Sequence, residues 1–211
     1  MSTIRTIKCI CSVCAEKSEQ RVLASSNRFG ASDLDLRPPE MLRSTMSLWI
    51  QECPHCGYVS ENIEDDTTID KDFLKSKEYR LCSNNDFKSE LTKMFYRYYM
   101  INLLDNNCDD AFHAILHAAW SCDDVGDKDK AVYCRKLAIV ELEKIIDNSN
   151  EETLKVQKAD LLRRAGLFNI VINEYSDLNF KDEILQKIIS FQIEKSNQED
   201  IKCYTVADVL E

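Results

Sequence analysis

At residues 53–58 the chain reads Cys53-Pro54-His55-Cys56-Gly57-Tyr58, and an earlier segment reads Cys11-Ser12-Val13-Cys14. Two CxxC pairs are the pattern of a tetrahedral zinc site, because each pair places two sulfurs within one tight turn. Pro54 fixes φ where the second turn begins, and Gly57 permits the positive φ that folds the backbone back. The pattern predicts zinc knuckles whose metal ligands are Cys11, Cys14, Cys53 and Cys56.

Alternatives exist for both the ligands and the metal. Cys9 could replace Cys11 as a ligand, although the spacing of two intervening residues favours Cys11. Four thiolates also suit an iron-thiolate or iron-sulfur centre, and CxxC pairs occur as redox dithiols. The redox motif normally lies in a βαβ unit, which the sequence does not indicate. We therefore expect zinc, and because four thiolates leave no position for water, we expect the zinc to be structural.

The charge of the chain is unevenly distributed. The formal net charge is −10, with seven basic and six acidic side chains in residues 1–60 but 20 basic and 31 acidic ones in residues 61–211. An acidic surface repels phosphate groups, which disfavours nucleic acid and anionic membranes as partners of the second part. Without an export signal or a long apolar run, we expect a cytoplasmic protein whose ten cysteines are thiols or metal ligands.

Strand patterns dominate the first 60 residues. Alternating β-branched and polar side chains predict a strand over residues 4–10, and a returning strand is expected within residues 18–29. A third strand is predicted over residues 45–52, where it would deliver Cys53 to the metal. Trp49 in that strand would cover the metal site or pack on the second domain.

The segment Asp33-Leu34-Asp35-Leu36-Arg37-Pro38-Pro39 alternates acid and leucine before a proline pair. The prolines exclude helix at Arg37, so we expect extended or looped backbone. Asp33, Asp35 and Arg37 are either a recognition edge beside the metal or a solvated strand edge, and the solvated edge is favoured.

Helical patterns replace strand patterns after a polar connector at residues 60–72. Short helical character is expected over residues 73–81, and apolar residues at helical spacing predict an amphipathic helix over residues 87–101, whose aromatic side chains are interpreted as core. Glycine turns at Gly126 and Gly166 separate further helices in the manner of tetratricopeptide repeats. A final helix is expected over residues 182–195. The predicted domains are a zinc ribbon at residues 1–62 and a helical-repeat domain at residues 70–200.

A second candidate site is the pair His113 and His117, which lie four residues apart on one predicted helix face with Asp110 and Asp124. This face could hold a divalent metal, but a solvated helix face is favoured. The sequence has no HExxH, GxSxG or Gly-rich phosphate motif, so we do not expect an enzyme. The remaining cysteines are interpreted as small buried hydrophobic residues: Cys82, Cys108, Cys122, Cys134 and Cys203.

Three segments together resemble a bacterial family of zinc-ribbon proteins with helical-repeat tails. They are residues 33–39, residues 53–58 and Arg163-Arg164-Ala165-Gly166. The resemblance covers most of the chain. It implies a cytosolic protein with metal ligands at the four cysteines of the CxxC pairs, and it implies no activity.

The expected fold is therefore α+β, a small N-terminal β zinc ribbon followed by an all-α, tetratricopeptide-like domain. Helical pairs form surfaces that suit protein partners, so we expect a zinc-binding interaction or scaffold module. The alternatives are a ribbon that binds nucleic acid and an enzyme that uses the His113 and His117 face with a metal.

Overall fold

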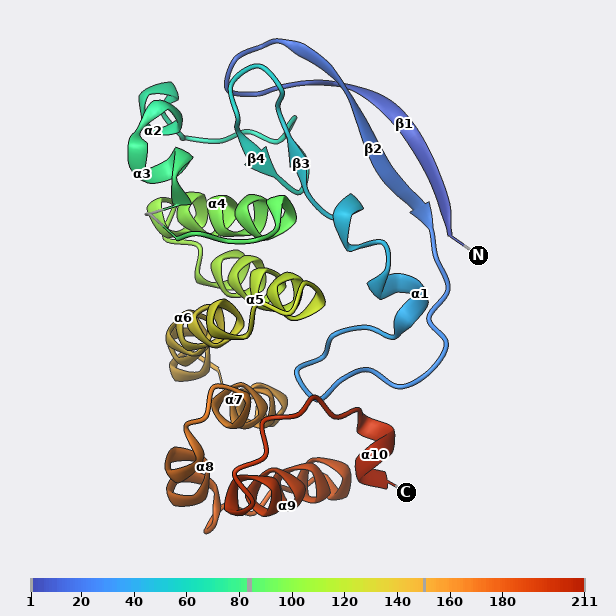
Figure 1. Cartoon of the computed structure of the whole chain (residues 1–211), viewed down its shortest axis with the longest axis vertical. Helices are drawn as coiled ribbons and strands as arrows, with labels where there is room; N and C mark the ends of the chain where they lie inside the picture. Colours follow the sequence, from blue (N-terminus) through green and yellow to red (C-terminus); the bar gives the residue numbers. More distant parts are fainter. Residues whose placement is uncertain (1, 83–84, 150, 211) are drawn as a thin grey trace.

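The computed structural model describes residues 2–82, 85–149 and 151–210. Two β-hairpins lie at one end of a stack of helices, and the segment between β2 and α1 runs back alongside that stack to meet the C-terminal segment (Figure 1). This α+β arrangement agrees with the predicted fold class. No helix among the described residues is long and apolar enough to cross a membrane.

The N-terminal strands form two separate antiparallel hairpins. β1 (Thr3–Ile10) pairs with β2 (Lys17–Ser25), and β3 (Gln51–Glu52) pairs with β4 (Val59–Ser60). The strand predicted over residues 4–10 and its returning partner are confirmed. Each hairpin has one CxxC pair in its turn, so the hairpins bring the four cysteines to the same end of the molecule.

The strand predicted over residues 45–52 is wrong, except for its last two residues in β3. The chain instead forms α1 (Glu40–Arg43) and a 3₁₀ helix, η1 (Met46–Leu48). Hydrogen bonds between residues three or four apart satisfy the backbone groups of this segment within single turns. Thr45 donates its hydroxyl to the Leu42 carbonyl at 2.7 Å and accepts from Trp49 Nε1 at 3.1 Å. Met46 and Ile50 are both buried at the four-residue spacing of a helical turn, which the alternating pattern concealed.

Helices make up most of the rest of the chain. The helices predicted over residues 87–101 and 182–195 are confirmed with shifted bounds, whereas the one predicted over residues 73–81 is divided at Ser76 into two short helices. The helix bounds are α2 Lys71–Lys75, α3 Lys77–Arg80, α4 Glu90–Leu104, α5 Cys108–Asp124, α6 Lys128–Asp147, α7 Glu152–Arg164, α8 Phe168–Tyr175, α9 Glu183–Asn197 and α10 Val206–Leu210. Successive helices pack on one another, and their apolar faces form one continuous core. The aromatic side chains of α4 belong to this core, since Phe95 is 1% exposed.

Glycine turns end α5 and α7 as predicted. Gly126 and Gly166 have φ of 68° and 74°, a backbone conformation that favours glycine. After α5, Asp127 donates its backbone N–H to the Cys122 carbonyl at 2.9 Å, which closes the helix end. These turns establish successive antiparallel helices, while the tetratricopeptide-type repeat remains a prediction.

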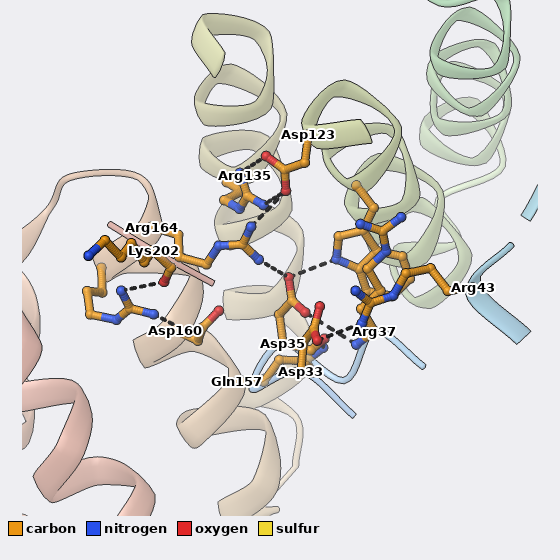
Figure 2. Close-up of polar contacts among 12 residues, drawn as sticks. Asp33, Asp35, Arg37, Arg43, Asp123, Arg135, Gln157, Asp160, Arg164 and Lys202 are labelled. Carbon is orange, nitrogen blue, oxygen red and sulfur yellow. Dashed lines mark hydrogen bonds and ion pairs between the residues drawn. The ribbon is translucent and has the colours of Figure 1, made fainter. Parts of the chain in front are cut away.

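Residues 33–37 form neither a recognition edge beside the metal nor a solvated edge, and both interpretations are wrong. Asp33, Asp35 and Arg37 are 2%, 0% and 6% exposed. Asp35 lies between α5 and α7, where its Oδ2 accepts from Trp120 Nε1 and from Arg164, each at 2.8 Å (Figure 2). A buried carboxylate needs hydrogen-bond donors and a counter-charge, because its burial without them costs several kcal/mol.

Further ion pairs surround this carboxylate and join the loop to three helices. Arg164 of α7 also contacts Asp123 at 2.7 Å, and Arg135 of α6 donates two hydrogen bonds to the same carboxylate (Figure 2). Burial alone would raise the pKa of Asp123, but Arg135 and Arg164 hold that pKa below its ordinary value. Arg37 contacts Asp124 at 2.6 Å. We call these residues, together with Asp35, the Asp35 network.

The C-terminal segment closes the structure on the same loop. The Leu34 N–H donates to the Tyr204 carbonyl and the Val206 N–H donates to the Ser32 carbonyl, both at 2.9 Å. Arg163, whose side chain is fully buried, donates to the backbone carbonyls of Asp200 and Lys202 at 2.6 and 2.9 Å. Residues beyond the predicted helical domain are therefore part of the packed structure.

Replacing Asp35 should destabilise the protein strongly. In Asp35→Asn the Arg164 guanidinium loses its fully buried counter-charge and keeps only the partly exposed Asp123. Breaking a buried pair lowers the free energy of unfolding by about 3 to 5 kcal/mol. Urea denaturation measures this loss. The exposed Asp66→Asn change is the matched control and should have an effect within about 0.5 kcal/mol. Equal stability of the two variants would contradict the role given to Asp35.

Candidate metal centre

The two CxxC turns have the same backbone construction. In the second turn, Gly57 N–H donates to the Cys53 carbonyl at 2.9 Å, and Cys53 N–H donates to the Tyr58 carbonyl at 2.8 Å. In the first turn, Ala15 takes the position of Gly57 and donates to the Cys11 carbonyl at 2.8 Å. Gly57 and Ala15 have φ of 77° and 62°. Both turns therefore fold back after the second cysteine, as zinc knuckles do.

The four sulfurs of these turns meet at one point. The Sγ atoms of Cys11 and Cys56 are 3.7 Å apart, those of Cys14 and Cys53 are 3.6 Å apart, and all four lie within 4.8 Å of one another. Cys11 and Cys53 are fully buried, whereas Cys14 and Cys56 are partly exposed. None of the four cysteines is in a disulfide. The structure thus brings together each ligand that the spacing predicts.

This geometry fits one tetrahedral ion. Metal–sulfur bonds of about 2.3 Å place tetrahedral sulfurs about 3.8 Å apart, close to the separations of 3.7 Å for Cys11–Cys56 and 3.6 Å for Cys14–Cys53. A cluster of several irons would have to push the sulfurs further from one another. Burial raises the pKa of the Cys11 and Cys56 thiols, and a cation between the sulfurs would offset this effect by favouring the thiolates. The group can hold a metal ion.

Hydrogen bonds and an ion pair of neighbouring residues also hold the two turns in place against the segment after β4 and against the helices. The Ser12 N–H donates to the Ile63 carbonyl at 2.9 Å, which ties the first turn to the segment after β4. The Tyr79 hydroxyl donates to the Gly57 carbonyl at 2.7 Å, and Arg97 of α4 contacts Glu52 at 2.8 Å. The second turn is therefore anchored on α3 and α4.

The other cysteines have different surroundings. Cys9 is fully buried in β1 and is not among the four convergent residues. Cys82, Cys122 and Cys134 are buried, as predicted. The prediction is wrong for Cys108, which is partly exposed, and for Cys203, which is exposed. Cys203 lies in the C-terminal segment that the helical pattern did not predict.

The histidine pair on α5 forms no metal group among the described residues, and its face is solvated only in part, since His113 and Asp124 are exposed whereas His117 is half-buried. The rings of His113 and His117 are 6.2 Å apart, and among the described residues no third ligating side chain joins them. Asp124 is paired with Arg37. His117 packs against the rings of Trp49, Phe95 and Trp120, at centroid distances of 5.2, 5.1 and 4.9 Å. Trp49 thus packs on the helical part, one of its two expected positions.

His117 should remain neutral far below neutral pH. Burial lowers its pKa to about 3, and the nearby charges of His113 and Arg37 act in the same direction. Because its ordinary pKa is 6.5, the stability that neutral His117 contributes is complete above pH 6.5 and is lost as the pH falls toward 3. NMR titration of the imidazole signals measures this pKa. A midpoint near 6.5 for His117 would contradict its enclosure, and His117→Phe assigns the signal.

No family model, curated protein or solved structure matches this chain. The assignment of the site therefore depends on the geometry of its own residues.

Proposed function

We propose that this protein is a zinc-binding protein-interaction module whose four-cysteine site is structural. The convergence of the sulfurs of Cys11, Cys14, Cys53 and Cys56 is the observation that carries the proposal. Four thiolates occupy every position of a tetrahedral ion, so no position is left for a reacting water. Zinc suits such a set of soft ligands and does not change its oxidation state.

The strands around this site support a structural role for the ion. β3 and β4 have two residues each, and most residues of β1 are exposed. Isolated hairpins of this size are marginally stable in water. A structural zinc ion supplies on the order of 10 kcal/mol or more to folding in small domains. Zinc would therefore hold the two hairpins in the positions that the CxxC turns require.

The surface of the helical part supports an interaction role. Exposed apolar side chains lie along it, including Leu104, Val140 and Ile184, which are 53%, 49% and 48% exposed. Residues 61–211 have 11 more acidic than basic side chains, 31 against 20, which favours a partner with a basic surface. Nucleic acid is the second candidate partner, because the outward face of the first hairpin carries Lys8, Lys17 and Arg21 in exposed positions.

The metal content of the purified protein tests the proposed zinc site. The purified protein should contain about one zinc ion per chain by elemental analysis, as a single four-thiolate site requires. Cys53→Ser removes a buried ligand and should abolish zinc binding and lower the thermal unfolding temperature. Cys203→Ser, which alters an exposed cysteine, is the matched control and should retain both. Zinc retained by Cys53→Ser would contradict the proposal, and iron in the protein would indicate electron transfer.

The interaction role is tested by affinity capture from extract of the source cells. The zinc-loaded protein should capture a protein partner after nuclease digestion, and Cys53→Ser should lose that partner while Cys203→Ser keeps it. If nuclease and moderate salt remove all bound material, the partner is nucleic acid. If nothing binds above the background of an unrelated acidic protein, the interaction role is wrong.

A further inference from the structure

A cavity of about 410 Å³ lies between the segment that follows β2 and helix α5, and Gln157 of α7 also lines it. Its volume is in the range of about 300–1,000 Å³ that small-molecule sites occupy. Trp49 and Trp120 both line it, and they are the two tryptophans of the chain. The four cysteines do not line the cavity, so it is separate from the metal centre.

The aromatic wall of this cavity is held in place by hydrogen bonds within the protein. Trp49 Nε1 donates to Thr45 and Trp120 Nε1 donates to Asp35, so neither indole N–H needs a partner in the cavity. His117 lies between the two indoles, with the buried ring of Phe95 also in contact. Rings fixed in this way present a preorganised apolar surface to a flat ligand.

Polar atoms without partners also line this cavity. Gln157 is 3% exposed and donates its Nε2 to the Asp35 carbonyl at 2.9 Å, but its Oε1 accepts no hydrogen bond from a described residue. The ring nitrogens of His113 and His117 have no hydrogen-bond partner among the described residues either. The Gln157 side chain is fixed by its bond to Asp35 while its Oε1 is free to accept a hydrogen bond from a ligand donor in the cavity.

One cation at the cavity is left without a counter-charge among the described residues. Asp35 is paired with Arg164, and Asp124 is paired with Arg37. Arg28 at the rim is exposed and has no ion pair with the described residues. The Arg37 guanidinium lies 5.8 Å from the centre of the Trp120 ring. The unpaired Arg28 guanidinium favours an anionic ligand over the cationic ligands that other aromatic cages bind.

Leu36 adds a strained residue to the wall. Its φ is 69°, in the left-handed region that a side chain disfavours, and the residue is 54% exposed between its buried neighbours Asp35 and Arg37. Its side chain lines this cavity and the adjacent one between α5, α6 and α7. Strained backbone of this kind is concentrated at ligand sites.

We propose that this cavity binds a small, flat aromatic molecule that carries an anionic group. The ring lies against Trp49 and Trp120, Gln157 Oε1 accepts a hydrogen bond from it, and Arg28 pairs with the anionic group. This site is independent of the proposed zinc-dependent interaction role.

The two indole N–H signals in a proton–nitrogen NMR spectrum report on the cavity directly, because the chain has two tryptophans and both line it. The zinc-loaded full chain is titrated with adenosine 5′-monophosphate and with indole-3-acetate, which combine an aromatic ring with a phosphate or a carboxylate. At least one should shift both signals in a saturable way. Inorganic phosphate alone should bind about tenfold more weakly or not at all, since it lacks the stacking ring. Adenosine, which lacks the anion, should bind severalfold more weakly than its monophosphate if the monophosphate binds.

Variants test whether the probe binds at the cavity and not elsewhere on the surface. Arg28→Ala and His113→Ala alter exposed residues at the cavity and should each weaken binding of the shifting probe severalfold. Arg5→Ala, an exposed arginine on β1, is the matched control and should bind like the unaltered protein, and the remaining signals report whether each variant is folded. Absence of a saturable shift with both aromatic anions overturns the proposal. Unchanged affinity in Arg28→Ala overturns the pairing with the anion.

Discussion

Four sulfur atoms from two separate turns can share one ion only if the chain between them folds back on itself. Cys14 and Cys53 are separated by 38 residues, yet their sulfurs are 3.6 Å apart. The strands that carry these turns are short or exposed, so they have little core of their own. A metal ion would replace the missing core, and the position of every residue near the turns depends on that convergence.

A second link connects the hairpins to the helices. Between β2 and α1 the chain runs along the helical stack (Figure 1), where the buried Asp35 carboxylate is held by Trp120 and Arg164. Buried ion pairs of this kind contribute little net stability. An alternative position of the loop would leave a buried charge without its partner, which is strongly unfavourable. The Asp35 network therefore sets where the loop lies. Because the cavity is bounded by that loop and α5, its shape depends on the same network.

Local patterns in the sequence predicted the local parts of this structure. The CxxC spacing identified the residues that converge, helical periodicity placed α4 to α9, and glycine marked the turns at Gly126 and Gly166. Such patterns do not predict contacts between residues that are far apart in the sequence. Asp35 bonds to Trp120 and Arg164 across 85 and 129 residues of sequence, which is why residues 33–37 were expected at an exposed edge. Ala15 has a positive φ that no pattern indicates for alanine.

X-ray absorption at the metal edge of the zinc-loaded protein tests the central claim most directly. If the two turns close around one ion, the spectrum should show four sulfur ligands at about 2.3 Å and no nitrogen or oxygen ligand. Fewer sulfurs in the first shell, or cysteines found as disulfides, would contradict the convergence of the four thiolates on a single ion.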